Sequence, residues 1–209
     1  MKTLFRAWFI TFERFQGQID DETNLPCGWH IGKLTELMDY AGGQQPPAEQ
    51  FLFEHQDGYI RLVQIRDYET DKYATYIPIS KKNKICESLD IMIARYGVSL
   101  GRICYGLSGA YNVALAKVFP RRPFYREYLR CYLKTDDFYN GINGSGERSA
   151  QQGFNQDNME DFEVVIPTDE VFKLFNEIVE PIVVRQLSIR TDIKYLSNLK
   201  ETFLIQLSR

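Results

Sequence analysis

Cysteine and histidine, the residues that most often build metal centres and disulfide frameworks, are scarce in this sequence. The 209 residues include four cysteines and two histidines. The cysteines lie far apart with no C-x-x-C pair, so the sequence predicts neither a zinc site nor a disulfide framework. Neither histidine has an acidic or cysteine residue at ligand spacing. We therefore expect no metal and no cofactor.

Long apolar runs are also missing. None reaches the roughly 18 residues that would span a bilayer. The first residues interleave Lys2, Arg6 and Arg14 with aromatic side chains, so they lack the uninterrupted apolar region and cleavage site of a signal peptide. These absences predict a cytoplasmic protein without a membrane partner. The net charge of −3 gives no bulk attraction to nucleic acid, so DNA contacts would need a local cluster of basic residues.

The motifs of common enzyme classes are absent. The sequence has no G-x-x-x-x-G-K-S/T phosphate loop, no G-x-S-x-G elbow and no H-E-x-x-H zinc motif. Gln45-Pro46-Pro47-Ala48 only superficially echoes the asparagine-proline-proline-aromatic motif of adenine methyltransferases. Acidic pairs such as Asp136-Asp137 lie in polar surroundings, where carboxylates are more often solvated than ligands. The sequence therefore predicts a protein that is not an enzyme.

What the chain does contain is a long apolar-periodic stretch from Thr168 to Arg209. Its apolar residues recur mostly every three or four positions, as an amphipathic helix requires. Pro181 interrupts this pattern, which predicts two helices or one helix kinked at Glu180. The part from Ile182 to Leu207 would be roughly 39 Å long at about 1.5 Å per residue, so most of it needs a partner outside the domain. The predicted partner-binding residues are Ile182, Ile189, Ile193, Leu196, Phe203 and Leu207.

The rest of the chain predicts an α+β fold with a β-rich domain between helical ends. Residues 1–15 form a predicted amphipathic helix, and a polar linker follows at 18–24. We place the domain boundaries at 1–17 (N-terminal helix), 25–167 (β-rich domain) and 168–209 (C-terminal helices). Alternating apolar residues predict strands at 59–66, 90–96, 101–105, 112–119 and 162–167, and a helix is expected at 123–133.

Several glycine-punctuated loops of this domain carry amide and guanidinium side chains. Gln, Asn and Arg hydrogen-bond base edges, while Lys, Ser and backbone N–H groups reach phosphates. The alternative is that these loops are solvated turns, where glycine permits a positive φ and amides bond locally. The candidate DNA-binding residues are Gln44, Gln45, Arg66, Tyr68, Lys81, Lys82, Lys84, Arg95, Tyr96, Ser145, Arg148, Ser149, Gln151 and Gln152.

Short motifs follow one another along the chain in a specific order. They are Leu25-Pro-x-Gly-Trp29, Gly42-Gly43, Gln64-Ile-Arg-Asp-Tyr68, Asp90-Ile-Met-Ile-Ala-Arg-Tyr-Gly97 with Gly101-Arg102, Asn112, Gly144-Ser-Gly146 with Gln152, Val165-Ile-Pro167 and the long helix. In this order they resemble one target-recognition domain plus spacer of a type I restriction-modification specificity (S) subunit. The resemblance covers nearly the whole chain.

This resemblance implies a function without chemistry of its own. Such a subunit reads a DNA target and docks the methyltransferase (modification) subunit and, through it, the restriction subunit. A complete one usually carries two recognition domains joined by two antiparallel helices, whereas this chain has one. The segment Lys2 to Phe12 resembles the last turns of the central helix, and Lys2-Thr-Leu-Phe5 is echoed by Glu201-Thr-Phe-Leu204. The chain therefore resembles the second half of an S subunit together with the end of its central helix.

A half subunit with an exposed apolar helix needs a partner. We expect a homodimer first, then pairing with a separate half-subunit or with the methyltransferase. Phe5, Trp8 and Phe9 of the N-terminal helix are expected to join the partner-binding surface. The alternative function is an interaction module that binds a methyltransferase or another S subunit through its helices and does not read DNA.

Overall fold

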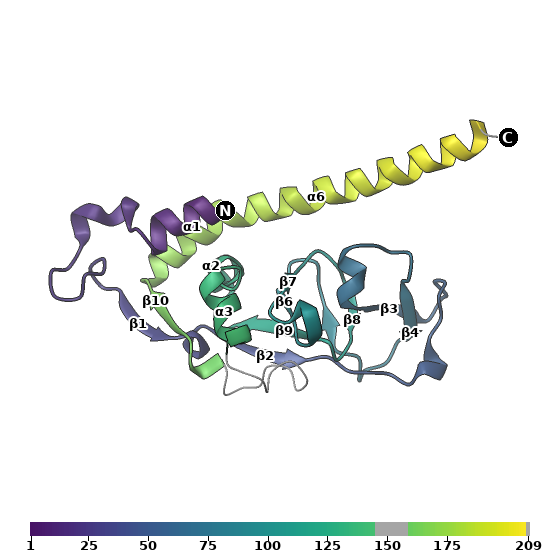
Figure 1. Ribbon diagram of the computed structural model, residues 1–209, viewed down its shortest axis with the longest axis horizontal. Helices are drawn as coiled ribbons and strands as arrows, with labels where there is room; N and C mark the ends of the chain where they lie inside the picture. The colour runs from purple at the N-terminus through teal and green to yellow at the C-terminus, as the bar shows by residue number, and fades with distance from the viewer. Residues whose placement is uncertain (145–158, 208–209) are drawn as a thin grey trace.

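One long helix, α6 (Asp169–Leu207), runs along one side of the molecule, and the strands lie on its other side (Figure 1). The computed structural model describes residues 1–144 and 159–207. No helix in these two ranges is long and apolar enough to cross a membrane. The mixture of helices and small sheets confirms the predicted α+β fold with a long C-terminal and a short N-terminal helix.

The strands form three small sheets. A two-stranded antiparallel ribbon lies near the start of α6, and two four-stranded sheets extend away from it beneath the helix (Figure 1). The ribbon pairs β1 (His30–Lys33) with β10 (Glu163–Ile166). The middle sheet has the antiparallel order β2 (Met38–Gly42), β9 (Leu115–Pro120), β6 (Met92–Ala94), β7 (Ile103–Cys104). The distal sheet has the order β4 (Thr75–Pro78), β3 (Tyr59–Val63), β8 (Gly109–Tyr111), β5 (Ile85–Cys86), in which only the β3–β8 pair is parallel.

Short helical segments connect these strands and cover the middle sheet. The α-helices are α1 (Lys2–Phe9), α2 (Arg126–Tyr132) and α3 (Asp136–Gly144). The 3-10 turns are η1 (Glu13–Gln18), η2 (Leu34–Glu36), η3 (Ala48–Gln50), η4 (Ile65–Tyr68), η5 (Gly97–Ser99) and η6 (Pro123–Tyr125). The predicted strands and the predicted helix at 123–133 are all present, but shorter than expected.

The N-terminal helix ends earlier than the sequence predicts. The helix α1 ends at Phe9, and Phe12 adopts a left-handed backbone with a φ of 52°. The chain then turns back as η1, so that the Phe15 ring lies 5.8 Å from Trp8 and 4.9 Å from Trp29, measured between centroids. Burial of Phe15 against these two rings requires the turn, which overrides the continuous helical pattern.

Pro181 lies inside α6, which continues through it as a single helix. Of the two predicted alternatives, two separate helices are therefore excluded, and a single helix through Pro181 is observed. Proline removes one hydrogen bond and crowds the preceding turn, at a cost of about 3 kcal/mol in a helix interior. The buried residues Val179 and Val183 lie on either side of it, and Arg126 of α2 forms an ion pair with Glu180. This packing offsets the cost and keeps the helix intact.

The main core is an aromatic cluster where α1, α2 and α6 meet. The Phe9 ring lies 4.9 Å from both Tyr128 of α2 and Phe175 of α6. Phe5, Trp8 and Phe9 are 4%, 3% and 1% exposed. Their assignment to a partner-binding surface is therefore wrong, because the apolar face of α1 is already covered by α2 and α6 of the same chain.

Candidate nucleic-acid interface

The bend after β2 brings the first candidate loop to the end of the middle sheet. Gly43 donates its N–H to the Leu115 carbonyl at 2.9 Å, and Gln44 donates its N–H to the Tyr111 carbonyl at 3.2 Å. A Cβ on Gly43 would lie 2.1 Å from the carbonyl oxygen of Asn112, so this position requires glycine. The side chains of Gln44 and Gln45 are exposed.

Arg95 and Tyr96 leave the end of β6 beside this bend. The Arg95 side chain lies against Gly42, and its Nη1 is 3.4 Å from the Val113 carbonyl oxygen, to which it donates. Its guanidinium also lies 5.2 Å from the centroid of the Tyr96 ring. β2 pairs with β9, and β9 pairs with β6. This pairing places the exposed amide of Gln44 and the guanidinium of Arg95 at the same edge of the middle sheet.

Of the three candidate lysines, Lys84 has a structural role. Its Nζ donates to the Gly42 carbonyl at 2.5 Å, which ties β5 to the bend after β2. Lys81 and Lys82 lie in the preceding turn and are exposed. Phosphate binding is therefore compatible with the positions of Lys81 and Lys82, whereas Lys84 would have to give up its bond to the backbone.

Arg66 and Tyr68 belong to η4, in a second group away from the bend. Arg66 is exposed and lies 5.7 Å from the Tyr73 ring centroid. The hydroxyl of Tyr68 is buried, and burial raises the pKa of this phenol. Its ring packs against a small core formed by Val63, Cys86, Met92, Cys104, Tyr111 and Leu115. The structure therefore removes the Tyr68 hydroxyl from contact with DNA, against the prediction.

Buried charges that sequence reasoning missed hold η4 in place. The Asp67 carboxylate accepts the N–H of Gln64 at 2.9 Å and lies 3.7 Å from Nη2 of Arg61. Burial raises the pKa of Asp67, although the Gln64 bond and Arg61 oppose this shift. Arg61 also pairs with Asp71 at 2.7 Å. The alternation of apolar and polar residues in β3 predicts that Arg61 lies on a strand. Its partners, Asp67 and Asp71, lie in and after η4, where the sequence has no periodic pattern.

The remaining candidates, Ser145, Arg148, Ser149, Gln151 and Gln152, lie outside the described residues. Within 1–144 and 159–207 there is no group of three or more His, Cys, Asp or Glu side chains that could hold a metal ion. The side chains gathered at the bend are hydrogen-bond donors and acceptors without a nucleophile. Their chemistry suits recognition of base edges and phosphates.

The predicted partner-binding residues of α6 lie on one exposed stripe. Four of them are spaced seven residues apart: Ile182, Ile189, Leu196 and Phe203. The other two, Ile193 and Leu207, follow Ile189 and Phe203 by four residues. Their exposed fractions run from 40% at Ile182 to 84% at Leu207. We call these six residues the partner stripe. Another face of α6, formed by Phe172, Phe175, Val179 and Val183, is buried against the domain.

No protein-family model and no curated protein matches the sequence. Solved structures do match. An S subunit from M. genitalium has a TM-score of 0.62 at 14% identity and covers 96% of this chain and 50% of its own. The HsdS subunit from Thermoanaerobacter tengcongensis has a TM-score of 0.57 at 17% identity over 92% of this chain and 44% of its own. A chain from a structure that describes complex assembly and conformational transition of the type I R-M system has a TM-score of 0.57 at 18% identity. The match covers 96% of this chain and 50% of that chain.

This chain spans about half the length of the solved chains that it matches. Because the identities are below 20%, the similarity concerns the fold alone. All three solved chains share this fold. Along the chain, the short α1 comes first, the three small sheets follow and the long α6 comes last. The motifs in the sequence imply the same order, with a β-rich domain followed by a long helix. The chain has the fold of about half of a type I restriction-modification S subunit.

Proposed function

We propose that this protein is a DNA specificity subunit of a type I restriction-modification system, which reads one half-site and docks the methyltransferase subunit. The observation that carries this proposal is the likeness to S subunits over 92–96% of the chain. It performs no catalysis in this role, and the restriction subunit reaches it through the methyltransferase.

The edge around the Gly42-Gly43 bend supports DNA reading. Arg95 and Gln44 carry the guanidinium and amide groups that form bidentate hydrogen bonds with guanine and adenine edges. Lys81 and Lys82 offer exposed charges for phosphates, which fix the register of a protein on the duplex without reading sequence. With a net charge of −3, the protein depends on such local groups for any attraction to DNA.

The partner stripe supports assembly. An exposed seven-residue apolar repeat is typical of helices that pair in coiled coils. A second copy on the stripe would give two recognition domains related by two-fold symmetry, and their half-sites would form a pseudo-palindrome with a spacer between them. The full assembly then contains this dimer, or a pair of different half-subunits, with the methyltransferase.

Selection from a random duplex library tests the reading of DNA. The wild-type protein, in complex with its methyltransferase or alone, should enrich a short sequence. The Arg95→Ala variant should lose discrimination at one base pair, which is worth about 1–3 kcal/mol for a bidentate contact. Lys33→Ala, which removes an exposed ion pair with Glu163 on the β1–β10 ribbon, serves as the control and should enrich the wild-type sequence. Identical enriched sequences for wild type and Arg95→Ala would exclude Arg95 from base reading.

A second candidate function is an interaction module that binds a methyltransferase or another S subunit without reading DNA. The exposed partner stripe is the observation that favours it. Salt dependence separates the two functions, because release of counterions makes DNA affinity fall steeply as salt rises. A protein that binds its partner but shows no salt-dependent affinity for any duplex would be an interaction module.

A further inference from the structure

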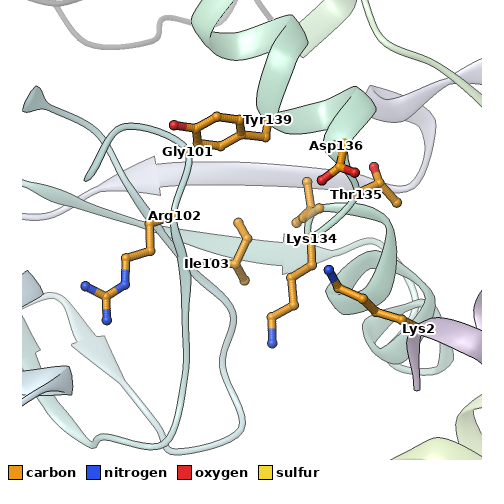
Figure 2. Close-up of a pocket in the computed structure, with 9 residues that line it drawn as sticks. Lys2, Gly101, Arg102, Ile103, Lys134, Thr135, Asp136 and Tyr139 are labelled. Atoms are coloured by element: carbon orange, nitrogen blue, oxygen red, sulfur yellow. The ribbon is translucent and has the colours of Figure 1, made fainter. Parts of the chain in front are cut away.

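A recess of about 370 Å³ opens between α1, the corner that joins α2 to α3, and β7. Its lining carries three cationic side chains, Lys2, Arg102 and Lys134, and one carboxylate, Asp136. Figure 2 shows Ile103 between Arg102 and Lys134, with Lys2 reaching in from α1. None of the candidate DNA-binding residues from the sequence belongs to this recess.

The cations of the recess are only partly neutralised. Arg102 pairs with Glu69 at 2.7 Å. No carboxylate lies within ion-pair distance of Lys2 or Lys134 among the residues that the structure describes. Lys2 is exposed and Lys134 is half-buried. The two lysines therefore form no ion pair in the described chain, and Asp136 is the one carboxylate that lines the recess beside them.

More positive charge lies behind this lining. The ring of Tyr105 is approached by three cations: Lys134 at 4.2 Å, Arg130 at 4.5 Å and Arg190 of α6 at 5.3 Å from its centroid. Such contacts stabilise a cation but do not cancel its charge. Because Arg130 is ion-paired with Glu127, the cations on this ring without an ion pair in the described chain are Lys134, after α2, and Arg190 of α6.

Arg130 is a buried cation beside the recess. Its side chain is fully buried, and it donates to Glu127 at 2.7 Å and to the Leu89 carbonyl at 2.7 Å. Its third nitrogen, Nη1, is buried with no hydrogen-bond partner in the described chain. Arg130 lines a second recess of about 250 Å³ that shares Lys2 and Lys134 with the first. Nη1 has almost no accessible surface, so Arg130 contributes positive potential beside the recess and not a direct anion contact.

We propose that this recess, called here the lysine recess, binds a phosphodiester group of the DNA backbone, with Lys2 and Lys134 as the phosphate contacts. The assignment rests on the proposed function of the chain. It is favoured over binding of a protein carboxylate because the hairpin between β6 and β7 joins the recess to the candidate interface. Arg95 and Tyr96 begin that hairpin loop, and Arg102 ends it, with the N–H of Gly101 bonded back to the Ala94 carbonyl.

The predicted role is positioning rather than reading. Lysine ammonium groups act as point charges, so they bind a phosphate whatever the neighbouring base. The recess of about 370 Å³ is open to solvent, so a phosphate of an extended backbone can reach it. Contacts here would hold the duplex across α1 and β7 while Gln44 and Arg95 address the base edges.

The test is the salt dependence of binding to a random-sequence DNA duplex, measured by fluorescence anisotropy with the full chain. The slope of log affinity against log salt is negative, and each lost phosphate contact lowers its magnitude by about 0.9. Lys2→Ala and Lys134→Ala should each lower it by about that amount, and the double variant by about twice as much. Asp136→Asn, which removes the carboxylate from the lining, should raise affinity at every salt concentration.

Lys173→Ala is the matched control. Lys173 is an exposed lysine of α6 that lies over the Phe124 ring, outside the recess, and its removal should leave the slope unchanged. Lys134→Arg keeps the charge and should retain the slope, which separates loss of charge from loss of packing on Tyr105. Thermal melting of each variant checks that the fold is intact.

The outcomes separate failure of the recess from failure of the proposed function. A wild-type slope that persists in the double variant would overturn the phosphate assignment while leaving DNA binding in place. Absence of salt-dependent DNA binding by the wild type would overturn both. A polyglutamate peptide is the probe for a protein carboxylate: if the double variant loses this peptide but keeps the DNA slope, the recess binds an acidic protein segment and the proposal is wrong.

Discussion

Lys194 of α6 forms an ion pair with Asp71, which joins the far half of the long helix to the distal sheet. Asp71 also binds Arg61 of β3 at 2.7 Å. Two further contacts lie one and two turns earlier on the same face of α6. Arg190 lies over Tyr105, and a Cβ on Gly106 would come within 2.7 Å of Leu187. The β-rich domain is thus held against the helix along several turns.

Breaking this ion pair should loosen the domain on the helix. Lys194→Glu places two carboxylates together, so we expect a wider distribution of distances between spin labels at Thr70→Cys and Leu204→Cys in a Cys27→Ser background, measured by double electron–electron resonance. The pair is partly exposed, so thermal stability should change little. Lys194→Arg keeps the charge opposite Asp71 and should retain the narrow distribution, and Lys200→Glu should have no effect. A distribution that stays narrow in Lys194→Glu would rule out a positioning role.

The partner stripe predicts a self-associating protein. Ile193 is 59% exposed in the middle of the stripe, and Ile193→Asp puts a charge at a surface that would be buried in a dimer. We expect light scattering at micromolar concentration to show a dimer for the wild type and a monomer for this variant. Asn198→Asp, on another exposed face of α6, should remain dimeric. A wild-type protein that is monomeric both with and without DNA would contradict pairing between copies.

The aromatic core predicts a large loss of stability when α1 is weakened. Phe9→Ala removes a ring that contacts Trp29, Tyr128 and Phe175. A buried Phe→Ala change costs about 3–5 kcal/mol, so urea denaturation should shift strongly. Phe53→Ala removes a ring that is 75% exposed and should have little effect. Equal effects of the two substitutions would show that α1 does not belong to the core.

The cysteines predict a single reactive thiol. Cys27 is exposed, whereas burial raises the pKa of Cys86 and Cys104 to about 11 and that of Cys131 to about 12. At pH 8 a thiol reagent should modify one cysteine in the folded protein and four after unfolding, and Cys27→Ser should abolish the fast reaction. Fast modification of two or more native thiols would contradict the burial.

The same raised pKa values contribute to the loss of stability at alkaline pH. A thiol whose folded pKa exceeds its unfolded value, 9.0, contributes stability that is complete below pH 9. This contribution is lost as the pH rises through 11, because the unfolded thiols then ionise more readily than the folded ones. Urea denaturation at pH 8 and pH 10.5 should therefore show a lower free energy of unfolding at the higher pH.

The elements with many periodic residues could be predicted from the sequence, whereas two of the short strands could not. The periodicity of α6 extends over dozens of residues, whereas β5 has two residues and β8 has three. A strand of two or three residues shows no alternation, and its existence depends on partners elsewhere in the chain. The β3–β8 pairing, for example, brings Leu62 beside Ala110.

The surfaces were harder to predict than the elements. The amphipathic pattern of α1 shows that one face is buried, but it does not show which surface covers that face, so Phe9 was assigned to a partner instead of to α2 and α6. The chemistry of Gln44 and Arg95 was visible in the sequence. The two residues are 51 positions apart in the sequence and come together because β2 pairs with β9 and β9 with β6. No local sequence pattern predicts this pairing.

Gly43 places a constraint on how this protein can change over time. The Asn112 carbonyl occupies the space of a side chain at position 43, so mutation there disturbs the backbone of two strands at once. Gln44 and Gln45, immediately beyond it, are exposed and make no side-chain contact that the fold requires. Substitutions that alter the chemistry of this edge can therefore accumulate next to a position that cannot vary, and divergent descendants of this chain should differ at 44 and 45 while keeping the bend.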